Sequence, residues 1–135
     1  MSSIVYGHIL CSDSSTASVD HNLQVLGSLP GVGTYLIRNM FSLLPQSGGH
    51  SYYGALIHFA AYYKEFWVLD DEWIAEYEAL LERLSWSSSE VIHAYTGKRY
   101  VWSSREIQGS PSIRGTPIAG RSEFASYHDL PHQSP

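Results

Sequence analysis

Histidine and tyrosine side chains recur at alternate positions in three apolar segments, and they are the first candidates for acid–base, metal or binding chemistry. Successive side chains of a β-strand point to opposite faces, so residues two apart share a face. One face would pack under helices, with Val5, Ile9, Ile57, Phe59 and Ile92. The opposite face, which we call the Tyr/His face, would hold Tyr6, His8, His58, Tyr62, His93 and Tyr95. Because tyrosine combines a large apolar area with a polar tip, we expect this face to bind a partner.

The three histidines of this face also raise the question of a metal site. Zinc requires about three protein ligands that converge within ~2.1 Å of one point. His8, His58 and His93 lie in separate segments, and the sequence has no HxH or HExxH spacing to support ligation. We therefore expect ordinary half-buried histidines that bond to tyrosine hydroxyls or to the backbone, with no metal site and no cofactor.

Carboxylates are concentrated in the segment Asp70–Trp86. From Glu65 to Glu82 the chain holds seven acidic residues and no basic one. Apolar residues at three- and four-residue spacing predict an amphipathic helix here, with acids favoured in its first turn by the helix dipole. The predicted partner-binding carboxylates are Asp70, Asp71, Glu72, Glu76, Glu78 and Glu82. They would face either solvent or a basic partner, and the sequence leaves both open.

No grouping of these residues predicts an active site. The sequence has no Ser-His-Asp context, no nucleophile elbow and no paired glycosidase carboxylates. Cys11 is the only cysteine, which excludes an intramolecular disulfide and fits a reducing cytoplasm. Cys11 follows an apolar run, so we expect it to have a structural role. We therefore expect a protein that is not an enzyme.

Charge and hydropathy exclude two classes of partner. The net charge is −5, so no basic footprint for nucleic acid is visible. The N-terminus does not resemble a signal peptide, and no apolar run approaches the ~20 residues needed to span a bilayer. We expect a cytoplasmic protein that binds neither nucleic acid nor membrane.

The elements that would position these side chains follow from apolar periodicity and turn residues. Strands are predicted at Ile4–Cys11, Tyr52–Phe66, Glu90–Thr96 and Arg99–Ile107, and helices at Thr16–Leu29 and Asp70–Trp86, whereas Thr34–Leu44 could be either. This order predicts an α+β domain over residues 1–107, with a mainly antiparallel sheet of four or five strands and both helices on one face, closest to a ferredoxin-like fold. Residues 108–135 are rich in Gly, Pro and Ser and predict an irregular C-terminal tail.

Four segments carry a resemblance to a known group of proteins. They are LIRNMFSLL, ALIHFAAYYKEF, EWIAEYEALLERLSW and EVIHAYT. Over Ile4 to Trp102 the chain resembles small cytoplasmic immunity proteins encoded beside polymorphic or type VI secretion toxins of bacteria. The resemblance implies a non-enzymatic protein that binds one cognate toxin and blocks its active site or substrate access. It brings no catalytic residues and does not place the interface.

The residues themselves are compatible with that function and with two others. An acidic inhibitor would fit a toxin with a basic cleft, because complementary charge speeds association and adds specificity. The β-α-β order and the Tyr/His face also fit a small ligand-binding or enzymatic domain of the dimeric α+β barrel type. A third hypothesis is a structural subunit that forms a homodimer through the sheet or the tail.

Overall fold

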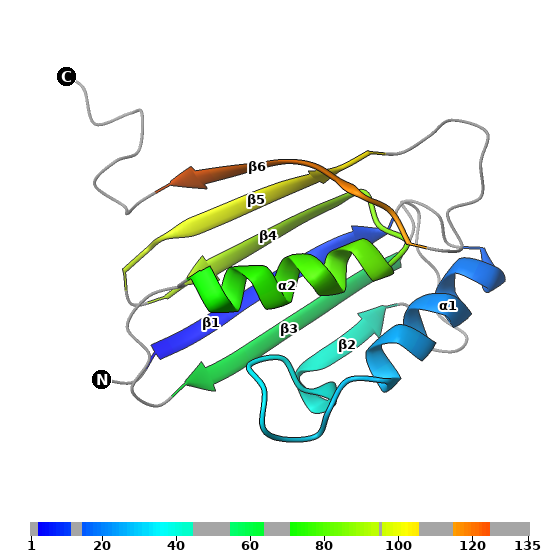
Figure 1. Cartoon of the computed structure of the whole chain (residues 1–135), viewed down its shortest axis with the longest axis horizontal. Coiled ribbons are helices and arrows are strands. Elements are labelled where there is room, and N and C mark those ends of the chain that lie inside the picture. The colour runs from blue at the N-terminus through cyan, green and yellow to red at the C-terminus, as the bar shows by residue number, and fades with distance from the viewer. Residues whose placement is uncertain are drawn as a thin grey trace.

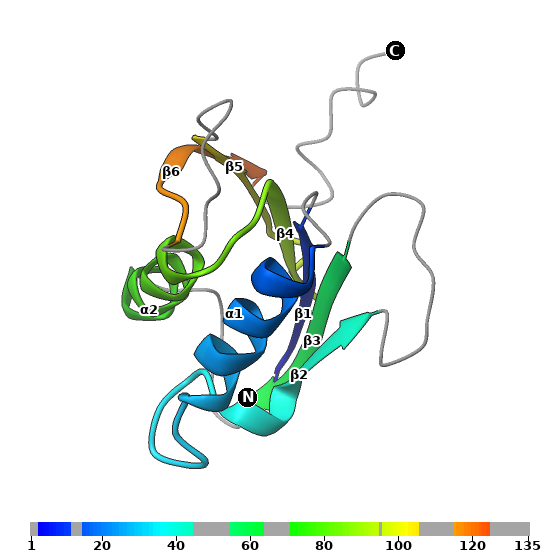
Figure 2. The same cartoon turned by 90° about the vertical axis from the view of Figure 1, so that its right-hand side faces the viewer.

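Six strands of the described part of the chain form one sheet, and two helices cover one of its faces (Figure 1). The computed structural model describes residues 3–11, 15–44, 55–63, 71–94, 96–105 and 115–124. The elements are β1 (Ser3–Cys11), α1 (Thr16–Gly27), the 3₁₀ turn η1 (Arg38–Met40), β2 (Phe41–Leu44), β3 (Ala55–Tyr63), α2 (Asp71–Arg83), β4 (Ser88–His93), β5 (Arg99–Ser104) and β6 (Ile118–Phe124). Figure 2 shows α1 and α2 on the same side of the sheet.

The strand order is β2-β3-β1-β4-β5-β6, and all neighbouring strands are antiparallel. Apart from the short η1 turn, the elements from β1 to β4 follow the order β-α-β-β-α-β, which is the element order of a ferredoxin-like unit. The predicted α+β class and antiparallel sheet are confirmed. The sheet is larger than predicted, with six strands in the described residues instead of four or five.

The sixth strand comes from the segment 108–135, for which the sequence predicted an irregular tail. β6 pairs with β5 and forms one edge of the sheet. Just before β6, the backbone N–H of Thr116 donates to the Leu84 carbonyl at 2.9 Å, and the Thr116 carbonyl accepts from the Trp86 indole at 2.8 Å. These bonds to the chain after α2 fix the approach to the strand. The few irregularly spaced apolar residues of β6 could not predict it.

Helix α2 supplies most of the aromatic core. Its buried side chains are Trp73, Ile74, Tyr77, Leu80 and Leu81. The Tyr77 ring lies at the centre, with ring centroids 5.0 Å from Trp73, 5.5 Å from Phe59 and 4.9 Å from Trp102. The predicted apolar stripe therefore faces the sheet, as its helical spacing requires. Within the described residues, neither this helix nor α1 has the length and apolar character to cross a membrane.

A glycine in β1 lets aromatic rings pack directly on the sheet. Gly7 is the cross-strand partner of Phe59 in β3 and Val91 in β4. A Cβ at Gly7 would clash with the carbonyl oxygen of Glu90 and lie 2.9 Å from the Phe59 ring. The absence of a side chain here makes room for Phe59 to reach the central ring of α2.

Helix α1 buries an amide next to an exposed leucine. Leu23 is 49% exposed, whereas Asn22 is 1% exposed. The Asn22 side chain donates to the Ser85 carbonyl at 3.0 Å and accepts from the Ser85 N–H at 2.8 Å. Both hydrogen-bonding groups of one buried peptide segment are satisfied this way, and α1 is held to the chain that follows α2.

The segment Thr34–Leu44, left open between strand and helix, contains both kinds of structure. Residues 31–37 form a loop, η1 makes one 3₁₀ turn, and β2 then pairs with β3 as the other edge of the sheet. The segment Tyr52–Phe66, predicted as one strand, forms β3 over Ala55–Tyr63, and the rest lies outside the described residues.

Candidate partner-binding surfaces

Four residues of the predicted Tyr/His face lie together on the side of the sheet that faces away from the helices. We call this side the open sheet face. Tyr6 and His8 come from β1, and His58 and Tyr62 from β3. His8 and His58 are direct cross-strand partners, and Tyr62 is 66% exposed. The alternation rule therefore brought these four residues together correctly on two neighbouring strands.

The prediction was wrong for His93, which points to the opposite, helix-covered side. His93 is fully buried, and its Nδ1 lies 2.7 Å from the Thr96 hydroxyl. Burial lowers the pKa of His93, and the nearby Lys98 charge lowers it further. In β4 the charged Glu90 stays on the open side, so every second residue from Ser89 to His93 faces the core. The sequence prediction instead placed Ile92 inward, and the charge of Glu90 was the signal that could have corrected it.

Two other predicted residues, Asp70 and the side chain of Tyr95, lie outside the described residues. Three residues that were not predicted belong to the open sheet face. Ile4 pairs with Tyr62 across the strands and is 48% exposed, Leu44 on β2 is 43% exposed, and Glu90 is the cross-strand partner of His8. The face is thus more apolar than expected, and its middle carries the sequence His58, His8, Glu90 across three strands.

This row of titratable side chains does not form a metal centre. Among the described residues, no group of three or more His, Cys, Asp or Glu side chains is placed to hold a metal ion. Glu90 is instead paired with Arg99, whose Nε lies 3.3 Å from its carboxylate. The guanidinium of Arg99 also stacks over the Phe124 ring at 4.3 Å. Glu90 and Arg99 are therefore held in place on the open sheet face by contacts within the sheet.

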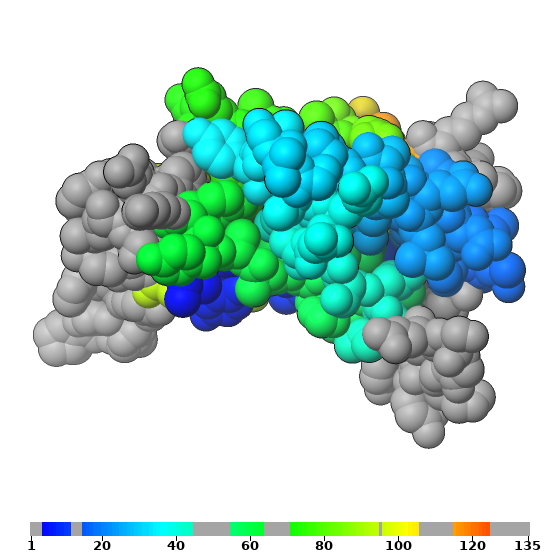
Figure 3. All heavy atoms as spheres, turned by 90° about the horizontal axis from the view of Figure 1, so that it is seen from below, coloured from blue at the N-terminus to red at the C-terminus, as the bar shows by residue number. Residues whose placement is uncertain are grey.

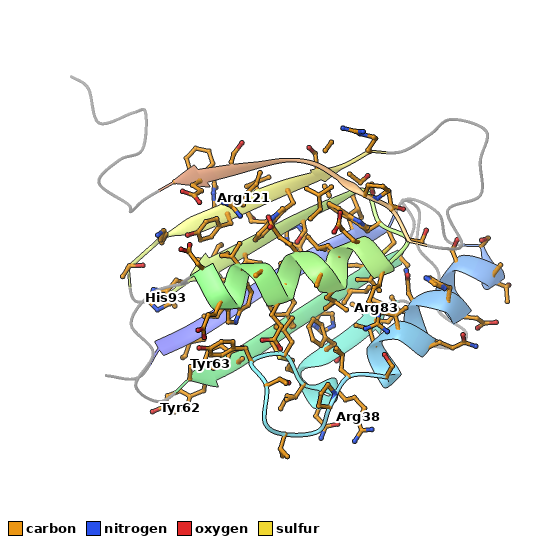
Figure 4. All side chains as sticks on the ribbon, in the orientation of Figure 1. Arg38, Tyr62, Tyr63, Arg83, His93 and Arg121 are labelled. Atoms are coloured by element: carbon orange, nitrogen blue, oxygen red, sulfur yellow. The ribbon has the colours of Figure 1, made fainter. Side chains whose placement is uncertain are left out.

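The predicted carboxylates of α2 separate into two groups. Asp71, Glu72 and Glu82 are exposed, and Glu76 is half-buried. Glu78 projects instead toward β5 and β6 and is engaged there, because its carboxylate accepts from the Trp102 indole at 2.7 Å and from Arg121 at 3.0 Å. Figure 4 shows Arg121 on β6 on the side of the sheet where α2 lies. Glu78 thus ties α2 to the edge of the sheet.

The loop that precedes η1 lies against the first half of α2 (Figure 3, loop in cyan). The Tyr35 hydroxyl donates to Glu72 at 3.4 Å, and the Leu36 N–H donates to Glu76 at 3.3 Å. From β3, the Tyr63 hydroxyl donates to the Tyr35 carbonyl at 2.8 Å and accepts from the Trp73 indole at 3.0 Å. Burial raises the pKa of Tyr63 to about 12, so its hydroxyl keeps its proton and can serve as donor at neutral pH.

A hollow opens between this loop and α2. It has a volume of about 430 Å³ and is lined by Gly33, Thr34, Tyr35, Glu72 and Glu76. With the neighbouring Asp71, these residues form what we call the α2–loop surface. The sequence predicted its carboxylates but not the loop, because only the folded chain brings residues 33–35 beside residues 72–76.

The one cysteine is not available as a nucleophile. Cys11 is fully buried in the core, where burial raises the pKa of its thiol to about 12. At neutral pH it is therefore a protonated, inaccessible thiol. Its Sγ lies 3.6 Å from the amide nitrogen of Asn22, which supports the structural role predicted for it.

Comparisons with known proteins give no further assignment. No protein-family model matches the chain, and no curated protein and no solved structure matches it either. The chemistry of the surfaces described above is therefore the basis for a functional proposal.

Proposed function

We propose that this chain is an immunity protein, a non-enzymatic inhibitor that binds a cognate secreted bacterial toxin and blocks its active site or substrate access. The observation that supports the proposal is the set of carboxylates on the α2–loop surface that form no ion pair with the described residues. The ion pairs among the described residues involve Glu78, Glu90 and Glu123. Asp71, Glu72 and Glu76 therefore have no basic partner within the described chain and are free to pair with one on a toxin.

Hydrogen bonds hold the loop of this surface in place, which favours tight binding. The loop is held to α2 by Tyr35 and by the backbone of Leu36, and to β3 by Tyr63. A surface ordered before binding loses less conformational entropy when the complex forms. Val32, which precedes Gly33 of the hollow in sequence, is 83% exposed and offers an apolar contact. An acidic surface with such an apolar residue suits a toxin whose basic cleft handles an anionic substrate.

The proposal places the protein in the cytoplasm, where such a toxin would reach its target. The test is coexpression with the product of the gene immediately upstream, scored by growth rescue, followed by measurement of binding kinetics. We expect rescue and tight binding with an association rate that falls as salt rises. Absence of both binding and rescue would refute the proposal.

A matched pair of double variants locates the interface. Glu72→Gln with Glu76→Gln removes two charges and keeps the acceptor oxygens for the loop. This change should slow association by roughly tenfold at low salt and weaken the salt dependence. Asp20→Asn with Glu123→Gln removes the same charge from exposed positions on α1 and β6 and should have little effect. Equal effects of the two double variants would show that net charge, not the α2–loop surface, governs association.

The hollow favours one second candidate, a small-ligand-binding or enzymatic domain. Its volume of about 430 Å³ lies within the range of roughly 300–1,000 Å³ usual for ligand pockets. Two carboxylates and the Tyr35 hydroxyl would select a cationic ligand. A panel of small organic cations, screened by thermal shift, would reveal such binding. A shift that Glu72→Gln with Glu76→Gln abolishes, in a chain that binds no toxin, would favour this function.

A further inference from the structure

We infer that the open sheet face binds a second copy of this chain, so that two sheets pack face to face about a twofold axis. The axis would run parallel to the strands, between β1 and β4. This face lies on the opposite side of the sheet from α2 (Figure 2), and the inference does not depend on the proposed function.

The first observation is the apolar character of a face that no described helix covers. Six large hydrophobic residues are exposed in the described part of the chain, and four of them lie here. They are Ile4 (48%), Tyr6 (42%), Leu44 (43%) and Tyr62 (66%). Ile4 and Tyr62 are cross-strand partners, so their exposed surfaces are continuous. Contiguous apolar patches of this kind mark interaction surfaces.

The second observation is the order of the side chains in rows across the strands. In the middle row His58 on β3 pairs with His8 on β1, which pairs with Glu90 on β4. In the next row Tyr6 on β1 pairs with Ile92 on β4. The boundary between β1 and β4 therefore separates histidines on one side from a carboxylate on the other.

A twofold rotation about that boundary makes the face complementary to itself. The rotation places β1 of one copy over β4 of the other and keeps each row in register. His8 then faces Glu90 of the second copy, and the symmetry repeats this pair. An imidazole N–H donates to a carboxylate whether the ring is neutral or charged. Tyr6 likewise faces Ile92 of the second copy, and the symmetry of an isologous interface repeats this apolar contact.

The size of the face is sufficient for a specific interface. Six strands spaced ~4.8 Å apart, with rows that extend over about 20 Å of every strand except the shorter β2, give a flat area of roughly 500 Å² per copy. The total area buried by the two copies would reach the roughly 1,000 Å² expected of a specific interface. This flat area does not include the additional surface of the protruding side chains.

Sedimentation equilibrium of the full chain, without toxin, across the micromolar range tests this inference. We expect a reversible monomer–dimer equilibrium. Ile4→Glu should raise the dimer dissociation constant by at least about tenfold, because it buries a charge in the interface. Leu23→Glu is the matched control, since Leu23 on α1 has nearly the same exposed fraction (49%) as Ile4 (48%) and should leave the equilibrium unchanged. Tyr62→Glu, at the most exposed of the four hydrophobic residues of the face, replaces Ile4→Glu if that variant does not fold.

A second pair of variants tests the charge complementarity. Glu90→Lys should weaken the dimer, because it removes the carboxylate that accepts from His8 of the second copy. Glu123→Lys also reverses a carboxylate that is paired with an arginine, at 3.5 Å, but on the helix-covered side of β6, and should leave the dimer intact. A monomer at every concentration, or equal effects of Ile4→Glu and Leu23→Glu, would overturn the inference.

Discussion

Replacing Asn22 by leucine should destabilise the protein severely, although the new side chain is apolar and similar in size. Asn22 is 1% exposed and Ser85 is 2% exposed, so neither can turn to water. The amide satisfies the carbonyl and the N–H of Ser85 at 3.0 Å and 2.8 Å. Leucine would leave both backbone groups buried without these partners.

The magnitude follows from the cost of unsatisfied groups. Each buried donor or acceptor that loses its partner costs about 1–3 kcal/mol, and leucine recovers part of this by burying apolar area. We expect Asn22→Leu to lower the free energy of unfolding by about 3 kcal/mol. For a chain of this length that corresponds to a decrease of about 10 °C in Tm.

Urea denaturation followed by tryptophan fluorescence measures this directly, because Trp86 adjoins Ser85 in sequence and is buried. Gln24→Leu is the matched control, since it removes the same kind of amide from an exposed position on the same helix. The control should change stability by no more than ~0.5 kcal/mol. An Asn22→Leu variant as stable as the control would refute the assignment of Asn22 as the tie between α1 and the chain after α2.

Three further predictions concern the core and the sheet. Gly7→Ala should cost about 1–3 kcal/mol of stability in thermal unfolding, because its Cβ would clash with the carbonyl oxygen of Glu90 and press on the Phe59 ring. Burial lowers the pKa of His93, so at mildly acidic pH the unfolded chain binds a proton that the folded chain does not. The free energy of unfolding should therefore fall as pH drops below about 6.5. His93→Gln should reduce that loss, as measured by urea titrations. Glu78→Ala should cost about 1–2 kcal/mol, because an indole and a guanidinium lose their acceptor, whereas Glu82→Ala should change the urea midpoint little.

The helices and the central strands could be predicted because their signal is local. Apolar spacing in α2 and the acids of its first turn define the helix without reference to the rest of the chain. Gly97, with φ of 75°, makes the predicted turn between β4 and β5 for the same reason, since such a backbone conformation favours glycine. Local rules of this kind depend on a few adjacent residues.

Hydropathy alone predicts neither which side of β4 faces the core nor the presence of β6, although the charge of Glu90 signals the orientation of β4. In β4, Val91 and Ile92 are equally apolar, so hydropathy alone does not decide which of them faces the core. Val91 faces the core on the same side as Ser89, whose hydroxyl lies 2.6 Å from the Tyr77 hydroxyl. β6 depends on bonds from Thr116 to residues about 30 positions earlier, which no sequence window contains.

Each candidate surface also has a part that could be predicted from the sequence and a part that could not. The carboxylates of α2 were visible in the sequence because they lie on one helix. The loop that completes the α2–loop surface reaches Glu72 and Glu76 only through tertiary contacts. On the open sheet face, the apolar contribution of Ile4 and Leu44 was missed because both residues look like core positions in a strand.

The two surfaces lie on opposite sides of the sheet, so their functions should be independent. A dimer formed through the open sheet face would leave both α2–loop surfaces exposed and would bind two toxin molecules. Ile4→Glu should therefore leave toxin affinity unchanged, and Glu72→Gln with Glu76→Gln should leave the dimer unchanged. If toxin binding instead dissociated the dimer, the toxin and the second copy of the chain would compete for the open sheet face. A toxin bound at the α2–loop surface does not touch the second copy and so cannot displace it by contact.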